Sequence, residues 1–303
     1  MKKQGAEEDI VNVVSPNCYP IKRRWWTKET VAVVTGANKG IGFALVRHLA
    51  GFGLNVVLTA RSPARGLQAV RSLRREGLHC HFHPLDVSDP NSIQHFALWF
   101  RRTFGVLDIL INNAGVSFNG IQENSVEQAE TVLQTNFYGP KILTEALLPI
   151  FRRSSNKARI FNISSRLGSI NKLKNPELKE KLLDEDGELS EKHIESMSRS
   201  FLESVKNGTW RSHGWPKVWT DYAVSKLALN AYSRVLSKRY KAHGLSVNCF
   251  CPGFTQTAMT GGVGTHTADA VAEVGARLVL LPPDDLATGK FYLFGSSYNS
   301  SKL

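Results

Sequence analysis

The chain has 303 residues, of which 42% are hydrophobic and 21% charged, so it can bury a large core in one or two domains. No apolar run is long enough for a transmembrane helix, and residues 1–30 lack a secretory or organelle signal, so a cytoplasmic location and no membrane partner are expected. The formal net charge is +12, but the basic residues are dispersed and form no arginine-rich arm, so no nucleic-acid partner is predicted.

Short β-branched runs alternate with helical patterns along most of the chain. Strands are predicted at residues 30–36, 55–61, 79–87, 107–115, 158–165, 245–253 and 289–295. Helices are predicted at residues 39–53, 64–77, 89–105 and about 221–243, with others between the later strands. This alternation predicts an α/β protein with a doubly wound parallel sheet (Rossmann fold), whose ligands bind beyond the carboxyl ends of the strands.

A single domain is predicted at residues 29–296. Residues 1–28 are interpreted as a polar N-terminal extension anchored by Trp25 and Trp26, and residues 297–303 as a C-terminal tail. The four cysteines are too few for a disulfide scaffold and match no zinc-binding spacing, so reduced core thiols and no metal site are expected. They are Cys18, Cys80, Cys249 and Cys251.

Residues 168–219 interrupt the alternation, because they contain no strand pattern. Asn175 and Pro176 are typical of a helix start, and a second helix is predicted at residues 190–208. The second helix carries one apolar stripe, which core packing explains better than a cofactor site. The stripe consists of Ile194, Met197, Phe201 and Val205. We interpret this interval as a helical insertion within the single domain.

The stretch TGANKGIG, residues 35–42, lies between the first predicted strand and the first helix. Gly36, Gly40 and Gly42 permit a tight turn and the close approach of a pyrophosphate to the backbone. The helix that follows adds unpaired N–H groups and a positive dipole end. The loop therefore predicts a dinucleotide site.

The end of the second predicted strand indicates which dinucleotide binds. An NAD site would have Asp or Glu there to bind the ribose 2′-hydroxyl. This chain has Arg61 instead, with Arg65 one helical turn further on and Lys39 in the glycine loop. Because three cations suit a 2′-phosphate, the predicted cofactor is NADPH/NADP+.

Seven short motifs then occur in a fixed order along the chain. They are TGANKGIG, LDVSD (85–89), NNAG (112–115), TNFYG (135–139), NISS (162–165), YAVSK (222–226) and CPG (251–253). In these motifs the chain resembles the short-chain dehydrogenases/reductases over about residues 30–295. The phrases RWWTKETVAVVTGANKGIGFALV, NGTW and WPKVWTDYAVSKLALNAY are most similar to monomeric carbonyl reductases, in particular plant neomenthol dehydrogenase-like and salutaridine reductase-like enzymes.

The resemblance implies a catalytic tetrad. Tyr222 would protonate a carbonyl oxygen as hydride arrives from the nicotinamide. Lys226, one helical turn away, would lower the pKa of the Tyr222 phenol and hold the nicotinamide ribose. Ser165 would hydrogen-bond the substrate oxygen, and Asn136 would position Lys226 and a water that relays protons.

The expected cofactor site combines the glycine loop, the cations and residues that the resemblance implies. Among the latter, Asp86 and Val87 would flank the adenine, and Pro252 and Gly253 would approach the nicotinamide amide. The complete set is Gly36, Asn38, Lys39, Gly40, Ile41, Gly42, Arg61, Arg65, Asp86, Val87, Asn113, Ala114, Gly115, Tyr222, Lys226, Pro252 and Gly253.

A second tyrosine precedes a lysine by four residues, Tyr298 before Lys302, but it lies in a Ser- and Asn-rich tail without a helical pattern. Tyr222 and Lys226 are therefore the favoured pair. Ser165 and Tyr222 are 57 positions apart, and the resemblance implies that the insertion between them makes the protein a monomer.

The sequence leaves two interpretations open for each of two features. Trp215 and Trp219 could each pack in the core or form an aromatic wall of the substrate cleft. The histidines at positions 79, 81 and 83 would share one face of a strand, as in a metal site, but no further ligand completes the set.

The sequence thus predicts an NADPH-dependent oxidoreductase that reduces a ketone or aldehyde of a small apolar molecule, such as a terpenoid or another specialised metabolite. One alternative is NADPH-dependent reduction of a conjugated carbon–carbon double bond on the same scaffold. The other is a non-catalytic NADPH-binding module, which would not need Ser165 and Tyr222 together.

Overall fold

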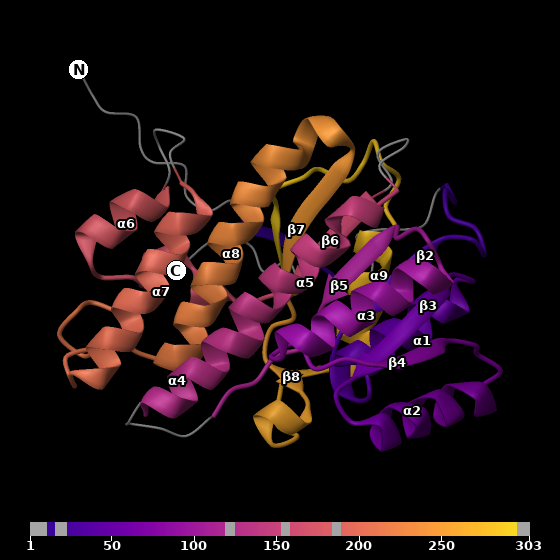
Figure 1. The fold of residues 1–303 in the computed structure, drawn as a ribbon, viewed down its shortest axis with the longest axis horizontal. Coiled ribbons are helices and arrows are strands. Elements are labelled where there is room, and N and C mark those ends of the chain that lie inside the picture. The colour runs from indigo at the N-terminus through magenta and orange to yellow at the C-terminus, as the bar shows by residue number, and fades with distance from the viewer. Residues whose placement is uncertain (1–10, 16–22, 119–124, 153–157, 184–188, 296–303) are drawn as a thin grey trace.

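The computed structural model describes residues 11–15, 23–118, 125–152, 158–183 and 189–295. Within them, eight parallel strands form one sheet in the order β1-β10-β7-β6-β5-β2-β3-β4 (Figure 1). The strands are β1 (Val11–Val14), β2 (Val31–Val34), β3 (Asn55–Ala60), β4 (His81–Pro84), β5 (Ile109–Asn112), β6 (Ala158–Ile163), β7 (Leu245–Cys251) and β10 (Phe291–Phe294). The predicted doubly wound parallel sheet is confirmed.

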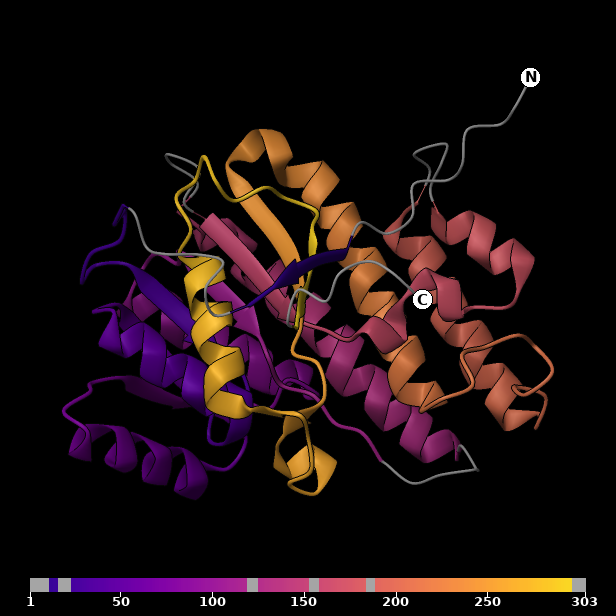
Figure 2. The ribbon, with the colours of Figure 1, turned by 180° about the vertical axis from the view of Figure 1, so that it is seen from behind.

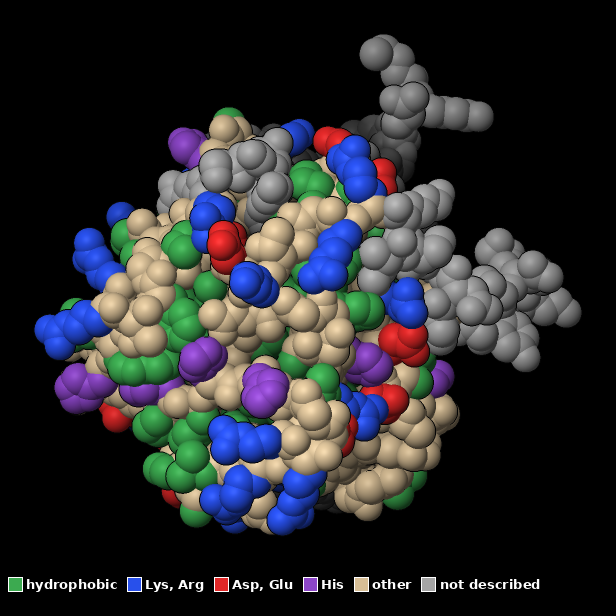
Figure 3. All heavy atoms as spheres, turned by 90° about the vertical axis from the view of Figure 1, so that its right-hand side faces the viewer, with side chains coloured by type: hydrophobic (Ala, Val, Ile, Leu, Met, Phe, Trp, Pro, Cys, Tyr) green, Lys and Arg blue, Asp and Glu red, His purple; other side chains and the backbone are tan. Residues whose placement is uncertain are grey.

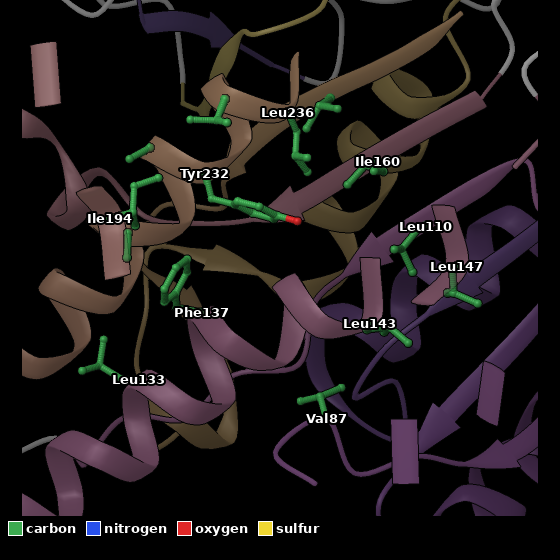
Figure 4. Close-up of a cluster of buried hydrophobic side chains, with 14 of the residues drawn as sticks. Val87, Leu110, Leu133, Phe137, Leu143, Leu147, Ile160, Ile194, Tyr232 and Leu236 are labelled. Atoms are coloured by element: carbon green, nitrogen blue, oxygen red, sulfur yellow. The ribbon is translucent and has the colours of Figure 1, made fainter. Parts of the chain in front are cut away.

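Helices cover both faces of the sheet, and each face has its own hydrophobic core. One face carries α1 (Gly40–Gly51), α2 (Pro63–Arg75) and α9 (Ala268–Val279), of which α9 lies in front of the sheet in Figure 2. The other carries α3 (Pro90–Thr103), α4 (Val126–Leu133), α5 (Gly139–Leu147) and α8 (Thr220–Tyr240), whose core Figure 4 shows in part. Because β2 lies between these layers, all four of its residues are buried, as expected of a parallel strand.

The strand order reverses at β2. Val33 of β2 pairs with Val57 of β3 on one side and with Leu110 of β5 on the other. The chain therefore winds outward from β2 in both directions, and the loops after β2 and β5 diverge. The carboxyl ends of all parallel strands meet at the same edge, so the predicted site residues converge there.

Residues 168–219 form the predicted helical insertion, which contains α6 (Pro176–Leu183) and α7 (Glu191–Lys206). The side-chain oxygen of Asn175 caps α6, as predicted, by accepting a backbone N–H at 3.0 Å. The apolar stripe of α7 packs into the core shared with α4 and α8. Its four members are buried: Ile194, Met197, Phe201 and Val205.

The N-terminal residues contribute more than the predicted polar extension. β1 pairs with β10, with Val13 opposite Leu293, and so forms an edge of the sheet that the sequence analysis did not predict. Trp26 is 3% exposed, and its indole N–H donates to the carbonyl oxygen of Phe52 at 3.0 Å, as an anchor should. Tyr298, Lys302 and the predicted tail at 297–303 lie outside the described residues.

The alternating histidines contact aromatic rings. His83 stacks on Trp99 with ring centroids 4.1 Å apart, and His81 meets Phe104 edge-on at 5.1 Å. No group of three His, Cys, Asp or Glu side chains that could hold a metal ion occurs among the described residues. Packing of β4 against α3 therefore accounts for these two side chains.

The side of the molecule seen in Figure 3 agrees with the predicted dispersal of the basic residues. Figure 3 shows Lys and Arg spread over one side of the molecule and not gathered in a single stripe. Within the described part of the chain, no helix combines the length and apolar character needed to cross a membrane.

An ion-pair network fastens α7 to the rest of the fold. The carboxylate of Glu191 lies 3.1 Å from Nζ of Lys141 on α5 and 2.6 Å from a guanidinium nitrogen of Arg239 on α8. The Glu191 side chain is only 19% exposed, so water screens these pairs weakly. Burial alone would raise the pKa of Glu191, but hydrogen bonds from Lys141 and Arg239 lower it below its usual value.

We expect Glu191→Gln to lower the free energy of unfolding by about 1–2 kcal/mol at pH 7, because two charge-assisted contacts are lost. The folded-state pKa of Glu191 is depressed, so its contribution is present above the unfolded-state pKa of about 4.3 and is lost as the pH falls through the lower folded-state value. Urea unfolding of both proteins from pH 7 downward should show the difference shrinking in acid. Glu203→Gln, at an exposed position on the same helix, is the control; an equal loss there would contradict the prediction.

Candidate active site

A cavity of about 430 Å³ lies at the carboxyl edge of the sheet, where the strand order reverses. Its walls come from the ends of six strands, β2 to β7, and from α8. It brings together all of the predicted cofactor-binding residues except Gly253. The lining residues that were predicted are Gly36, Asn38, Lys39, Gly40, Ile41, Gly42, Arg61, Arg65, Asp86, Val87, Asn113, Ala114, Gly115, Tyr222, Lys226 and Pro252.

Close backbone approach explains the glycines of the loop after β2. A Cβ atom on Gly42 would lie 2.4 Å from Nδ2 of Asn113 and 2.9 Å from backbone atoms of the loop itself. Gly36 has a φ of +60°, and a Cβ atom there would lie 2.8 Å from Cα of Ala114. Nδ2 of Asn113 donates to the carbonyl oxygen of Thr35 at 2.8 Å. The loops after β2 and β5 are thus fastened together at the floor of the cavity.

Lys39, Arg61 and Arg65 line the same cavity, and Arg61 and Arg65 are exposed. Ser62 lies beside them and caps α2 by accepting the backbone N–H of Arg65. In the described part of the chain, none of the three cations forms an ion pair with an acidic side chain. Their charges are therefore available to a bound anion.

Ser165, which follows β6, lies close enough to Tyr222, in the first turn of α8, to lower the pKa of its phenol by hydrogen bonding. Leu167 holds Ser165 in place by donating its backbone N–H to Oγ at 3.1 Å. The neighbouring Ser164 instead donates its hydroxyl to Oδ1 of Asn230 at 2.5 Å. The second serine of the NISS motif is therefore the one that contacts the phenol.

Lys226 lies one turn along α8, with Nζ 5.6 Å from the centroid of the Tyr222 ring and 2.8 Å from the carbonyl oxygen of Ile163, to which it donates. The residue is 4% exposed, and burial lowers its pKa to about 8. Burial also raises the pKa of Tyr222, although the hydrogen bond from Ser165 acts in the opposite direction. The prediction that the Tyr222 pKa would be lowered is wrong, because desolvation outweighs the favourable contacts.

Asn136 lies in a π-helical turn, Gln134–Tyr138, between α4 and α5. Its side-chain amide accepts the backbone N–H of Val116 at 2.8 Å and donates to the carbonyl oxygen of the same residue at 2.9 Å. It also donates to the hydroxyl of Ser225 at 3.1 Å. Asn136 therefore ties the loop after β5 to α8, and within the described residues it makes no hydrogen bond to Lys226.

Several lining residues were not predicted. Most adjoin predicted ones in the sequence, but one segment, 257–259, follows β7 and lies near a small sheet of β8 (Thr255–Gln256) and β9 (His266–Thr267). A Cβ atom on Gly40 would lie 3.6 Å from Cγ2 of Thr257, a contact for which the sequence carries no signal. The residues that were missed are Ser62, Leu85, Ser88, Val116, Ser117, Phe118, Thr135, Ile163, Ser164, Thr257, Ala258 and Met259.

The family model for short chain dehydrogenase matches residues 30–176 and 212–267. The gap between these segments falls on α6 and α7, which agrees with an insertion in the family pattern. The chain therefore belongs to the short-chain dehydrogenases, a family of oxidoreductases.

Individual relatives match nearly the whole fold. The chain is 37% identical to (+)-neomenthol dehydrogenase of Arabidopsis thaliana over 284 residues, which cover 86% of this chain and 95% of that protein. It is 38% identical to human carbonyl reductase [NADPH] 1 over 262 residues, which cover 84% and 92%. The structure of salutaridine reductase from Papaver somniferum superposes with a TM-score of 0.80 at 35% identity, covering 87% of this chain and 99% of that one.

We expect Gly42→Ala to destabilise the protein by about 1–3 kcal/mol, because the added methyl group would displace Asn113 and the backbone of the glycine loop. Gly51→Ala, at the end of the same helix, is the control: a Cβ atom there meets nothing within 4 Å, and alanine favours the helix. Thermal or urea unfolding measures both. Equal stability of the two variants would contradict the close contact at Gly42.

Proposed function

We propose that this protein is an NADPH-dependent reductase that converts a ketone or aldehyde of a small apolar molecule, such as a terpenoid or another specialised metabolite, to an alcohol. The observation that carries the proposal is the contact of Ser165 with Tyr222, beside Lys226, at a cavity that Tyr222 and Lys226 line together with the glycine loop and three cations. A module that only binds a dinucleotide would not need a buried phenol and serine hydroxyl in contact.

The cavity fits a dinucleotide phosphate. Gly36 and Gly42 leave the backbone open at the start of α1, where the helix N-terminus favours a pyrophosphate. Lys39, Arg61 and Arg65 would hold the 2′-phosphate, since none of them is paired with an acidic side chain of the described residues. The name of the human relative includes NADPH, which supports the same cofactor. When bound, the cofactor would supply the hydride.

The protein's own contribution is to bind the carbonyl oxygen and to deliver a proton to it. The hydroxyl of Ser165 would donate a hydrogen bond to that oxygen. The raised pKa of Tyr222 keeps the phenol protonated but makes it a weaker acid, so proton transfer to the oxygen would depend on stabilisation of the phenolate. Lys226, next to the ring, would stabilise the phenolate that results, and its carbonyl partner Ile163 holds the ammonium in place.

The cavity wall supports an apolar substrate. Phe118 is 42% exposed and Met259 is 37% exposed, and both line the cavity beside Val116. Such exposed apolar side chains at the rim of a cleft are typical of a ligand site. The names of relatives, a neomenthol dehydrogenase and a salutaridine reductase, agree with a small apolar molecule.

We also propose a monomer, because α7 covers the outer side of α4 and α8.

The first test is NADPH oxidation with terpenoid ketones, aldehydes, quinones and enones, with product identification to separate carbonyl from alkene reduction. Tyr222→Phe should lower kcat at least about 100-fold, as expected for loss of a general acid, while NADPH still binds by fluorescence titration. Tyr232→Phe is the matched control. Its hydroxyl is buried in the core (Figure 4) without a hydrogen-bond partner, so its loss should leave kcat and stability nearly unchanged.

Full activity in Tyr222→Phe would refute the proton-transfer role. If only the carbon–carbon double bond of the enones is reduced, the activity is alkene reduction and not carbonyl reduction. NADPH binding without turnover on any compound of the panel would favour the non-catalytic module.

The choice of cofactor rests on the three cations. Arg61→Ala should raise the KM for NADPH roughly tenfold or more and leave the KM for NADH nearly unchanged, because only NADPH carries the 2′-phosphate. Arg71→Ala removes an exposed arginine of α2 that does not line the cavity, and should change neither constant. Equal losses for the two nucleotides in Arg61→Ala would contradict the assignment.

A further inference from the structure

Trp219 is the N-cap residue of α8, three positions before Tyr222. Its backbone has φ 48° and ψ 57°, and among the described residues it is the only non-glycine with a positive φ. A bulky side chain in this left-handed conformation is strained, and asparagine or glycine would adopt it more readily. Trp219 also makes no side-chain capping bond. The local backbone conformation therefore does not explain why a tryptophan stands at position 219.

Core packing does not explain it either, as comparison with Trp215 shows. Trp215 is 3% exposed, donates its indole N–H to Oγ of Ser204 at 2.9 Å and meets the ring of Phe201 edge-on. Trp219 is 37% exposed, and its ring meets the ring of Tyr222 at a centroid distance of 6.2 Å and an interplanar angle of 81°. Of the two interpretations left open by the sequence, Trp215 takes the core position, and Trp219 stands beside the phenol.

We propose that Trp219 determines substrate specificity: its indole ring forms the wall of the substrate cleft next to Tyr222 and selects carbonyl compounds that carry a flat aromatic or conjugated ring. This inference rests on the proposed function and deepens it. Trp219 is not among the residues that line the 430 Å³ cavity, but its ring contacts the ring of Tyr222, which does line it, so the indole would extend the cleft beyond the phenol. An exposed indole there offers a flat π surface, which prefers another aromatic ring to a puckered saturated one.

The backbone conformation explains how the ring keeps its position. The carbonyl oxygen of Trp219 accepts the N–H of Ala223 at 2.7 Å, the first hydrogen bond of the helix that carries Tyr222. The indole and the phenol are therefore placed by the same helical turn, and the two rings meet edge-on. Strain of this kind is often found at functional sites.

The test compares 2-tetralone with 2-decalone, which share a bicyclic carbon skeleton and an isolated ketone but differ in having an aromatic or a saturated ring. The wild-type protein should prefer 2-tetralone. Trp219→Asn should lower kcat/KM for 2-tetralone roughly tenfold, mainly through KM, and lower that for 2-decalone less than about threefold. The Tm of Trp219→Asn should rise, because asparagine adopts the left-handed conformation with less strain.

Two further variants separate an aromatic role from a structural one. Trp219→Phe keeps an aromatic ring and should retain most of the preference for 2-tetralone. Val218→Ala alters the 59% exposed neighbour in the same segment and should keep the wild-type ratio of kcat/KM values. The KM for NADPH, measured in each variant, should change less than about twofold if the cofactor site is intact.

Equal losses on both ketones in Trp219→Asn, or a wild-type preference for 2-decalone, would overturn the inference. So would reduction of other carbonyl compounds by a wild-type protein that accepts neither bicyclic ketone. A wild-type protein that binds NADPH but reduces no carbonyl compound would refute the proposed function itself, which distinguishes the two failures.

Discussion

Every strand of the sheet runs in the same direction, and the site depends on this constraint. Parallel pairing places the loops after β2, β3, β5 and β6 on one edge, although they are separated by up to about half the length of the chain. Because the strand order reverses at β2, these loops diverge and leave a cavity between them. The hydrogen bond from Asn113 to the carbonyl oxygen of Thr35 then fixes the distance between the loops after β2 and β5.

Burial sets the electrostatics of the candidate site. It favours the neutral forms of both Tyr222 and Lys226, so the phenol keeps its proton and the lysine pKa falls to about 8. Only close partners oppose this effect: Ser165 for the phenol, and Cys249 and Cys251 for the ammonium. The helix that carries both residues is buried over most of its surface, since the insertion covers it from outside. The helices α6 and α7 of the insertion thus help to bury α8 without lining the cavity.

Much of this arrangement could be predicted from local patterns. The strand and helix alternation, the glycine loop and the cap at Asn175 involve residues that are neighbours in the sequence. The pairing of β1 with β10 could not be predicted in this way, because it joins residues 280 positions apart, for example Val13 and Leu293. The closeness of Thr257 to the glycine loop could not be predicted for the same reason, since it depends on how the segment after β7 folds back.

The sequence by itself determined the fold class, the family motifs, the insertion and the set of polar groups available for chemistry. The tertiary structure alone decided which groups meet. Ser165, and not Ser164, contacts Tyr222, and Trp219, and not Trp215, lies beside the phenol. Asn136 forms its hydrogen bonds with Val116 and Ser225. It also decided the direction of the Tyr222 pKa shift. The physical reason is that periodicity and turn chemistry act over a few residues, whereas desolvation and side-chain contacts depend on segments that only packing brings together.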